Sequence, residues 1–206
     1  MKKLLIATRN EGKLRELTSF LSDLPIQIVS LTNLGITDDV EEDGTTYAEN
    51  AKKKALFYAK RSSLPTLSDD GGLEIAALGN APGINSKRWL GEGTTEEDLL
   101  EHMHRVANDL PDTNRNAAFI NVVAFALPTG EVFASSGRID GIIARKPSGK
   151  RRKGLPYRLY FFLPGLNMYY DEAFLTREQM AQYNHRRQSV ESIKPVIQDV
   201  LLTHKN

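Results

Sequence analysis

The chain of 206 residues is long enough for one large domain or two small ones with a buried core. Hydrophobic residues make up 40% of it, and 27 basic against 26 acidic side chains leave a net charge of +1, so nothing in the composition calls for a nucleic-acid or membrane partner. The absence of cysteine excludes disulfides and thiolate metal sites. No apolar run suits a signal peptide or approaches the roughly 20 residues of a membrane span, so we expect a cytoplasmic protein.

The first third of the chain alternates strand and helix patterns, which favours an α/β fold. The helices are expected because apolar residues recur at helical spacing, and the strands because short apolar runs end at Pro, Gly or polar residues. In chain order the patterns predict strand 3–7, helix 11–24, strand 26–31, helix 46–60, and extended segments 64–68 and 73–76. We expect the sequence SDDGG (68–72) between the last two segments to form a turn.

The rest of the chain is expected to hold a helix, a long hairpin and a C-terminal helix. The patterns predict a helix starting at Thr94, strands 117–127 and 131–143 joined by the turn 128–130, a basic loop 145–154, strand 157–163 and helix 176–200 with a kink or break at Pro195. No linker or repeat interrupts the chain, so we expect a single domain over residues 1–206, with two lobes.

Four polar clusters are candidates for chemistry. They are the turn after the first strand, the acidic stretch 41–51, the SDDGG sequence and the basic group 184–187. Each has a structural explanation by itself: a capped helix start, a solvated acidic loop, turn-forming aspartates and a solvated helix face. Together they supply carboxylates for a hard divalent cation, a lysine at a strand-end turn and a His-Arg pair, which suits hydrolysis of a phosphoanhydride.

In order and spacing these blocks resemble the inosine/xanthosine triphosphate pyrophosphatases, from Lys3 to about Val190. The matching blocks are TRNEGKLREL (8–17), EEDGTTYAENAKKKA (41–55), SDDGGLEIAALGNAPGINSKRW (68–89) and HRR (185–187). The resemblance implies an elongated α/β fold of two lobes, in which a mixed twisted sheet flanked by helices surrounds a central nucleotide-binding cleft. It also implies a homodimer that uses Mg²⁺ to convert ITP, dITP and XTP to the monophosphate and pyrophosphate.

The resemblance also implies roles for individual residues. Asp70 would bind the metal with Glu41 and accept the proton of the attacking water, and Lys13 would act with it in catalysis. Glu49 and Asn50 would support the metal site. The implied substrate-binding residues are Thr8, Arg9, Asn10, Glu11, Gly12, Lys13, Gly71, Leu155, Pro156, Tyr157, Arg158, Met180, His185 and Arg186.

The chain departs from the family pattern where the base should bind. Gly71 replaces a serine, Leu155 and Arg158 replace the phenylalanine and aspartate of an F-G-Y-D-P-x-F segment, Met180 replaces a lysine, and Asn184 replaces the serine of S-H-R. We expect a retuned enzyme in which Arg158 donates hydrogen bonds to O6 and N7 of a 6-oxo purine. Alternatively, Arg158 pairs with Asp171 or Glu172. Two other functions stay open: the same hydrolysis with a shifted base preference, and nucleotide binding without turnover.

Overall fold

The computed structural model describes residues 2–203 and divides into two compact units. Among these residues, unit 1 comprises 2–70, 121–137 and 185–203, and unit 2 comprises 71–120 and 138–184. Three strands have residues in both units. The single domain expected over residues 1–206 stays a prediction.

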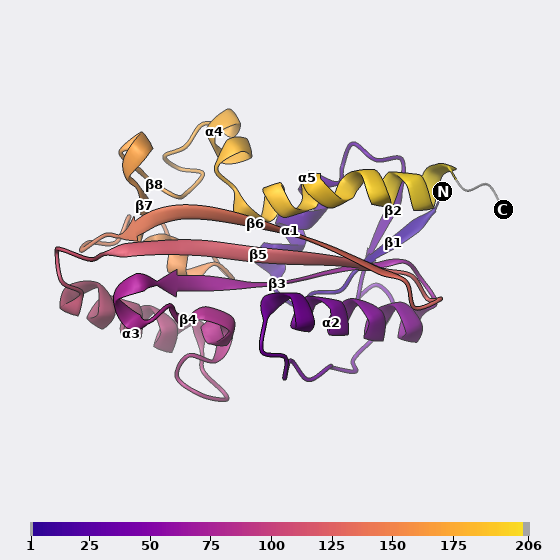
Figure 1. Cartoon of the computed structure of the whole chain (residues 1–206), viewed down its shortest axis with the longest axis horizontal. Coiled ribbons are helices and arrows are strands. Elements are labelled where there is room, and N and C mark those ends of the chain that lie inside the picture. Colours follow the sequence, from indigo (N-terminus) through magenta and orange to yellow (C-terminus); the bar gives the residue numbers. More distant parts are fainter. Residues whose placement is uncertain (1, 204–206) are drawn as a thin grey trace. The chain divides into compact units, whose positions relative to one another are not determined.

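The sheet is mixed and flanked by helices, as predicted (Figure 1). Its strands are β1 (Lys3–Ile6), β2 (Gln27–Ser30), β3 (Thr66–Ile75), β4 (Ala81–Pro82), β5 (Asn116–Ala126), β6 (Val132–Ile143), β7 (Phe161–Leu163) and β8 (Met168–Tyr169). Hydrogen-bonded neighbours follow the order β2-β1-β3-β5-β6-β7-β8, and β4 pairs with β3. β1 is parallel to β2 and β3, whereas β3–β4, β6–β7 and β7–β8 are antiparallel.

The helices are α1 (Glu11–Phe20), α2 (Tyr47–Ser62), α3 (Glu96–Asp109), α4 (Arg177–Gln182) and α5 (His185–Gln198). Short 3₁₀ turns lie at Ala76–Leu78, Gly83–Arg88, Pro156–Leu159 and Pro164–Leu166, and α5 continues into a π-helical turn at Asp199–Thr203. Thr46, Thr95 and Thr176 start α2, α3 and α4 with capping boxes, which explains why these helices begin there.

Unit 1 packs helices on both faces of its strands. Successive strand side chains point to opposite faces, and β1 follows this rule. Leu4 and Ile6 belong to the apolar cluster shared with α1 and α5, whereas Leu5 and the following Ala7 belong to the cluster that contains Tyr58 of α2. Helix α2 therefore covers the face opposite α5 (Figure 1).

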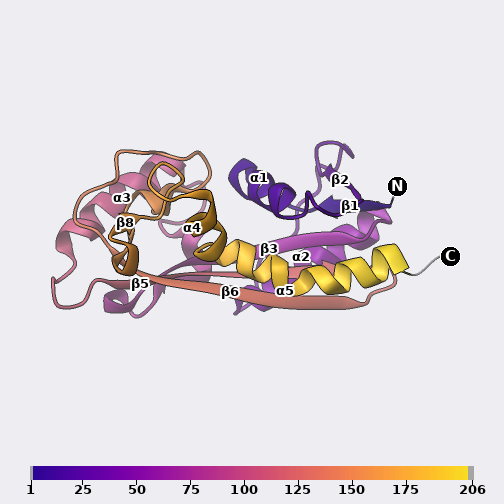
Figure 2. The ribbon, with the colours of Figure 1, turned by 90° about the horizontal axis from the view of Figure 1, so that it is seen from above.

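Unit 2 has one apolar core. Leu73 of β3, Met103 of α3 and Phe161 of β7 belong to it, and Trp89 and Met180 pack against its edge. Helix α3 contributes Met103 through the apolar face that its sequence predicts, and α3, α4 and β8 can be followed in Figure 2.

Three expected boundaries are wrong. SDDGG is not a turn but the middle of the continuous strand β3, because β1 pairs with the start of that strand and β4 with its end. The long C-terminal helix breaks after Gln182, not at Pro195, which lies inside α5. The strand expected at 157–163 starts only at Phe161, and Pro156–Leu159 is a 3₁₀ turn.

Candidate active site

The turn from β1 to α1 is a capped helix start at the carboxyl end of a strand. Asn10 Oδ1 accepts a hydrogen bond from the backbone N–H of Lys13 at 3.0 Å, and Thr8 Oγ1 accepts one from the N–H of Asn10 at 3.2 Å. Glu11 is exposed and Gly12 is buried in the first turn of α1. The N-terminus of a helix beyond a parallel strand carries partial positive charge, so this turn suits an anion.

Arg9 contacts the loop before α2 rather than the turn in which it lies. Its Nη2 donates to the backbone carbonyls of Thr37 at 2.9 Å and Asp38 at 2.7 Å. These contacts tie the turn to the loop before α2, so Arg9 supports the loop in the structure as described.

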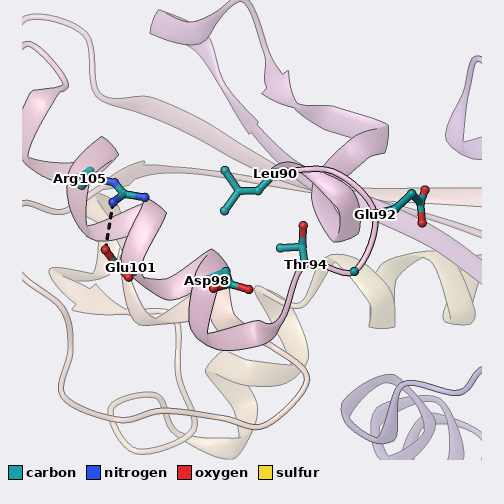
Figure 3. A pocket seen from close by; sticks show the side chains of 7 residues that line it. Leu90, Glu92, Thr94, Asp98, Glu101 and Arg105 are labelled. Atoms are coloured by element: carbon teal, nitrogen blue, oxygen red, sulfur yellow. Dashed lines mark hydrogen bonds and ion pairs between the residues drawn. The ribbon is translucent and has the colours of Figure 1, made fainter.

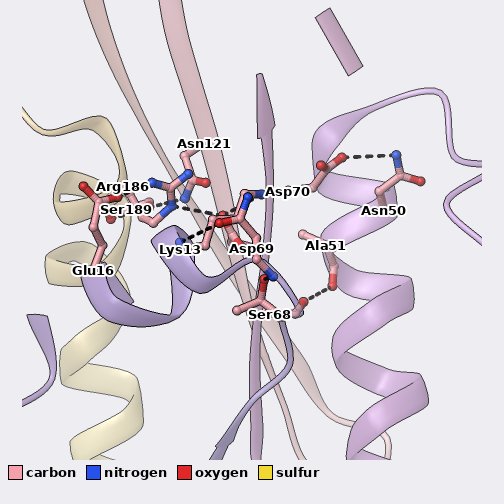
Figure 4. A network of polar contacts seen from close by, with 12 residues as sticks. Lys13, Glu16, Asn50, Ala51, Ser68, Asp69, Asp70, Asn121, Arg186 and Ser189 are labelled. Atoms are coloured by element: carbon pink, nitrogen blue, oxygen red, sulfur yellow. Dashed lines mark hydrogen bonds and ion pairs between the residues drawn. The ribbon is translucent and has the colours of Figure 1, made fainter. Parts of the chain in front are cut away.

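β3 separates the two adjacent aspartates. Because side chains alternate along a strand, Asp69 faces α1 and α5 together with Leu67, and Asp70 faces α2 together with Ser68. Figure 4 shows the two carboxylates pointing apart. The sequence alone had grouped them as one acidic pair in a turn.

Asp69 lies fully buried between cations. Its Oδ2 lies 3.1 Å from Nζ of Lys13 and 3.1 Å from Nε of Arg186 (Figure 4). Burial alone would favour the neutral acid, but the charges of Lys13, Arg186 and Lys54 outweigh it and lower the pKa of Asp69 to about 2. Asp69 is therefore ionised at neutral pH and holds two cations at fixed positions.

Asp70 lies in a different electrostatic environment. Burial, helped by the negative charge of Glu42, raises the pKa of Asp70, although Lys13, Lys54 and a hydrogen bond from Asn50 work against the rise. Nδ2 of Asn50 donates to Oδ2 of Asp70 at 3.1 Å. Asp70 is therefore the more basic of the two neighbours and the better proton acceptor.

Asn50 joins Asp70 to the acidic loop. Its Oδ1 accepts the backbone N–H of Gly44 at 2.8 Å, while its amide nitrogen holds Asp70. A Cβ on Gly44 would lie 2.6 Å from Asn50 Oδ1, so only glycine permits this approach. Glu49, expected near the metal, serves instead as the capping-box acid of α2, accepting the N–H groups of Thr45 and Thr46.

Glu42 is closer to the charged cluster than Glu41 in the described contacts. Glu41 is exposed, whereas Glu42 Oε1 lies 2.5 Å from Nζ of Lys54 and acts electrostatically on Asp70. Burial disfavours the charge on Lys54, but the carboxylates of Glu42 and both aspartates outweigh it and raise the pKa of that lysine. In the family pattern E-x-G, the glutamate two residues before Gly44 is Glu42.

The start of α5 is held against β6. A Cβ on Gly137 would lie 2.0 Å from the carbonyl oxygen of His185, so the strand and the helix are in direct backbone contact there. Ser189, one turn further along α5, accepts a hydrogen bond from Asn121 of β5 at 2.8 Å and its carbonyl accepts one from Ser135 of β6 at 2.5 Å. These contacts fix the backbone position from which the buried side chains of His185 and Arg186 extend.

The remaining expected site residues belong to unit 2. Tyr157 is buried and its hydroxyl donates to the carbonyl of Ser86. The guanidinium of Arg158 lies 4.5 Å from the ring centroid of Tyr170, and its Nη2 is 3.3 Å from that hydroxyl oxygen. Asp171, an alternative partner for Arg158, accepts hydrogen bonds from Arg152 at 3.0 and 3.1 Å.

Gly71, Leu155 and Pro156 are half-buried, and Met180 packs on the unit 2 core. Unit 2 also contains a surface hollow of about 280 Å³ (Figure 3). Its lining residues are Leu90, Glu92, Gly93, Thr94, Asp98, Glu101 and Arg105. None of the expected site residues lines this hollow.

Sequence reasoning missed Glu16, Glu42 and Lys54. Lys54 follows Asn50 by four residues on α2 and Lys53 follows it by three, so both lysines lie on the face of Asn50, whereas Lys52 does not. Helical spacing from Asn50 would have narrowed the three lysines to Lys53 and Lys54. Glu16 is a buried acid on the inward face of α1, three residues after Lys13.

Within residues 2–203, no three His, Cys, Asp or Glu side chains are grouped so that they could hold a metal ion by themselves. In the same part of the chain no helix is long and apolar enough to cross a membrane.

Comparisons with known proteins agree with this architecture. Residues 4–196 match the model of the Ham1 family. A dITP/XTP pyrophosphatase of Shigella flexneri is 41% identical over 194 residues, 92% of this chain and 95% of that protein. Solved Ham1 proteins of Coxiella burnetii and Staphylococcus aureus have TM-scores of 0.80 and 0.78 at 33% and 31% identity, covering 97% and 96% of this chain and 100% and 98% of theirs. The chain belongs to the Ham1 family.

Proposed function

We propose that this protein hydrolyses non-canonical purine nucleoside triphosphates such as dITP, ITP and XTP to the nucleoside monophosphate and pyrophosphate. The names of its curated relatives support this substrate class. The observation that carries the proposal is the division of labour between two neighbouring carboxylates: Asp69 lies 3.1 Å from both Lys13 and Arg186, whereas Asp70 points to the opposite face of β3, where Asn50 holds it.

The residues around Asp70 suit a divalent cation of the Mg²⁺ type. The available donors are carboxylate oxygens, and Mg²⁺ in proteins is commonly held by one or two carboxylates together with substrate phosphates and water. Burial and the like charge of Glu42 raise the pKa of Asp70, and a bound cation would relieve the repulsion between the two acids. Asp70 and Glu42 would hold the ion, with Glu42 in the role expected of Glu41. When bound, the metal neutralises phosphate oxygens and orients the chain of phosphates.

The side chains of unit 1 account for the rest of the reaction. Lys13, beside the N-terminal turn of α1, contributes a positive charge to the triphosphate. Asp70 accepts a proton from the attacking water as its oxygen bonds to phosphorus, and pyrophosphate leaves with the electrons of the broken P–O bond. Asn50 keeps the carboxylate of Asp70 in place.

The departures from the family pattern draw base selection to Arg158 in unit 2. The side chain of Arg158 is 3% exposed and lies against the ring and the hydroxyl of Tyr170. Contact between Arg158 and a 6-oxo purine therefore stays a prediction, and so do homodimerisation and a cytoplasmic location.

The test is pyrophosphate release from ITP, dITP, XTP, GTP and ATP, with and without Mg²⁺. We expect Mg²⁺-dependent release from the first three, and its loss in Asp70→Asn. Asp112→Asn is the matched control, because Asp112 pairs with Arg145 on the exposed surface of unit 2. Release from none of the nucleotides, or full activity of Asp70→Asn, would overturn the proposal.

A further inference from the structure

Arg186 is the residue whose described contacts differ most from the role that the resemblance implies. A residue that contacts substrate needs donors directed toward it. The side chain of Arg186 is 4% exposed, and two of its nitrogens are engaged within unit 1: Nε donates to Asp69, and Nη1 donates to Glu16.

Glu16 is the last member of a chain of alternating charges that begins and ends on α1, so only the backbone of the helix closes it. Lys13 and Glu16 lie three residues apart on α1, so their side chains leave the same face of the helix. Lys13 contacts Asp69, Asp69 contacts Arg186, and Arg186 returns to Glu16 (Figure 4). We call these four residues the ion-pair ring.

The ion-pair ring connects three elements that are distant in sequence. α1 supplies Lys13 and Glu16, β3 supplies Asp69, and α5 supplies Arg186. Three of the four side chains are about nine-tenths buried or more, and only Lys13 is partly open, with 19% of its side chain exposed. The exposed member of the ring is thus the one cation that could meet a phosphate.

We propose that Arg186 and Glu16 are positioning residues for Lys13. Glu16 holds the guanidinium of Arg186, and Arg186 fixes the carboxylate of Asp69, which sets where Nζ of Lys13 lies beside β3. This inference rests on the proposed function, since it takes Lys13 to bind the triphosphate. It gives Arg186 an effect on phosphate binding that does not depend on the base.

The test compares Arg186→Gln and Glu16→Gln with Arg187→Gln and Glu191→Gln. The second pair is the matched control, because Arg187 and Glu191 form a partly exposed ion pair on the same helix, 3.5 Å apart. Two quantities are measured below the unfolding temperature: the Kd of inorganic triphosphate with Mg²⁺, and kcat/KM for ITP and GTP. Lys13→Gln is the positive control for loss of phosphate binding.

We expect both ring variants to weaken triphosphate binding about tenfold, and to lower kcat/KM for ITP and GTP by the same factor, so that the ratio between them stays constant. The variant that combines Arg186→Gln with Glu16→Gln should bind triphosphate little more weakly than either single variant, because the two residues act as one unit. The control pair should remain within about twofold of wild type.

Two results would overturn the inference. One is an Arg186→Gln protein that binds inorganic triphosphate normally but changes the ITP-to-GTP ratio, which would mean that Arg186 contacts the base. The other is a pair of ring variants with lowered Tm and unchanged triphosphate affinity, which would mean a purely structural role. If Arg186→Gln does not fold, the triphosphate affinity of Glu16→Gln tests the inference. We expect that variant to fold, because the amide oxygen of glutamine can still accept a hydrogen bond from the guanidinium although the ion pair is lost.

A failure of the proposed function gives a different pattern. Wild-type protein would then bind inorganic triphosphate without releasing pyrophosphate from any nucleotide. The affinities of the ring variants for inorganic triphosphate would still decide the positioning role.

Discussion

Lys13 and Arg186 of unit 1 are held differently from Arg151 and Arg152 of unit 2. In unit 1, Lys13 and Arg186 share one buried carboxylate, so a change at either leaves a buried charge without its partner. In unit 2, Arg151 and Arg152 have side chains 47% and 38% exposed, so water can replace a lost partner. The five departures from the family pattern, at Gly71, Leu155, Arg158, Met180 and Asn184, all belong to unit 2. Lys13, Asp69 and Arg186, which hold one another by charge, are not among these departures.

The largest effect is expected from removing the carboxylate of Asp70 in unit 1. Asp70→Asn should lower kcat by about 10²–10⁴-fold, because it removes the proton acceptor. It should also raise Tm at pH 7, since a carboxyl whose pKa is raised in the folded protein costs stability when ionised. Pyrophosphate release and thermal unfolding of the same preparation check both effects. A variant that is less stable than wild type would contradict the electrostatic account of Asp70.

The neighbouring carboxylate should behave in the opposite way. Asp69→Asn should lower the free energy of unfolding by about 3–5 kcal/mol at pH 7, because two buried cations lose their shared anion. The pKa of Asp69 is lowered from 3.8 to about 2, so its contribution is complete above pH 3.8 and is lost as the pH falls through about 2. Urea unfolding at pH 7 and at pH 2 should therefore show a gap between wild type and variant that shrinks with acid. A gap independent of pH would contradict this.

A backbone change sharpens the comparison without touching a charge. Gly137→Ala should destabilise the protein by about 1–3 kcal/mol and lower activity, because the added Cβ would push α5 and its first residues away from β6. Gly165→Ala is the control, since nothing lies within 4 Å of a Cβ there. Unfolding midpoints and pyrophosphate release measure the effect. Equal stability of the two variants would show that α5 can shift freely.

The smallest expected effect concerns unit 2. Arg158→Leu should lower the free energy of unfolding by about 1–2 kcal/mol, because a desolvated cation–π contact with Tyr170 is lost. Arg151→Leu, at an exposed ion pair, should change it by less than about 1 kcal/mol. The ITP-to-ATP ratio of Arg158→Leu tests base recognition separately. An unchanged ratio would contradict the predicted contact between Arg158 and the base.

Most elements could be predicted from periodicity and caps. The Thr94-Thr95 helix start and the 128–130 hairpin turn are local signals, and the structure confirms both. The continuity of β3 could not be predicted, because Asp-Asp-Gly-Gly favours a turn locally and pairing with the strands β1, β4 and β5 keeps it extended. The break before α5 was also hidden, since no proline or glycine marks it.

The family and the charged residues of the site could be predicted from motif order, but their grouping could not. Asp69 and Asp70 were treated as a pair, and only strand geometry sends them to opposite faces. Lys54 was hidden in a run of three lysines, because its role depends on the face of α2 that meets β3. Glu16 was missed because its partner lies 170 residues away.

The long sequence separation between Glu16 and Arg186 has a consequence for how the protein folds during synthesis on the ribosome. The pair Glu16–Arg186 and the pair Arg186–Asp69 join residues 170 and 117 positions apart. Such long-range contacts form late and slow folding. Until α5 has emerged and docked, β3 carries a buried-type carboxylate with only part of its counter-charge, and α1 lacks the partner of Glu16. A nascent chain that ends before α5 should therefore be both inactive and prone to aggregate. Docking of α5 is then the folding step that completes the active structure.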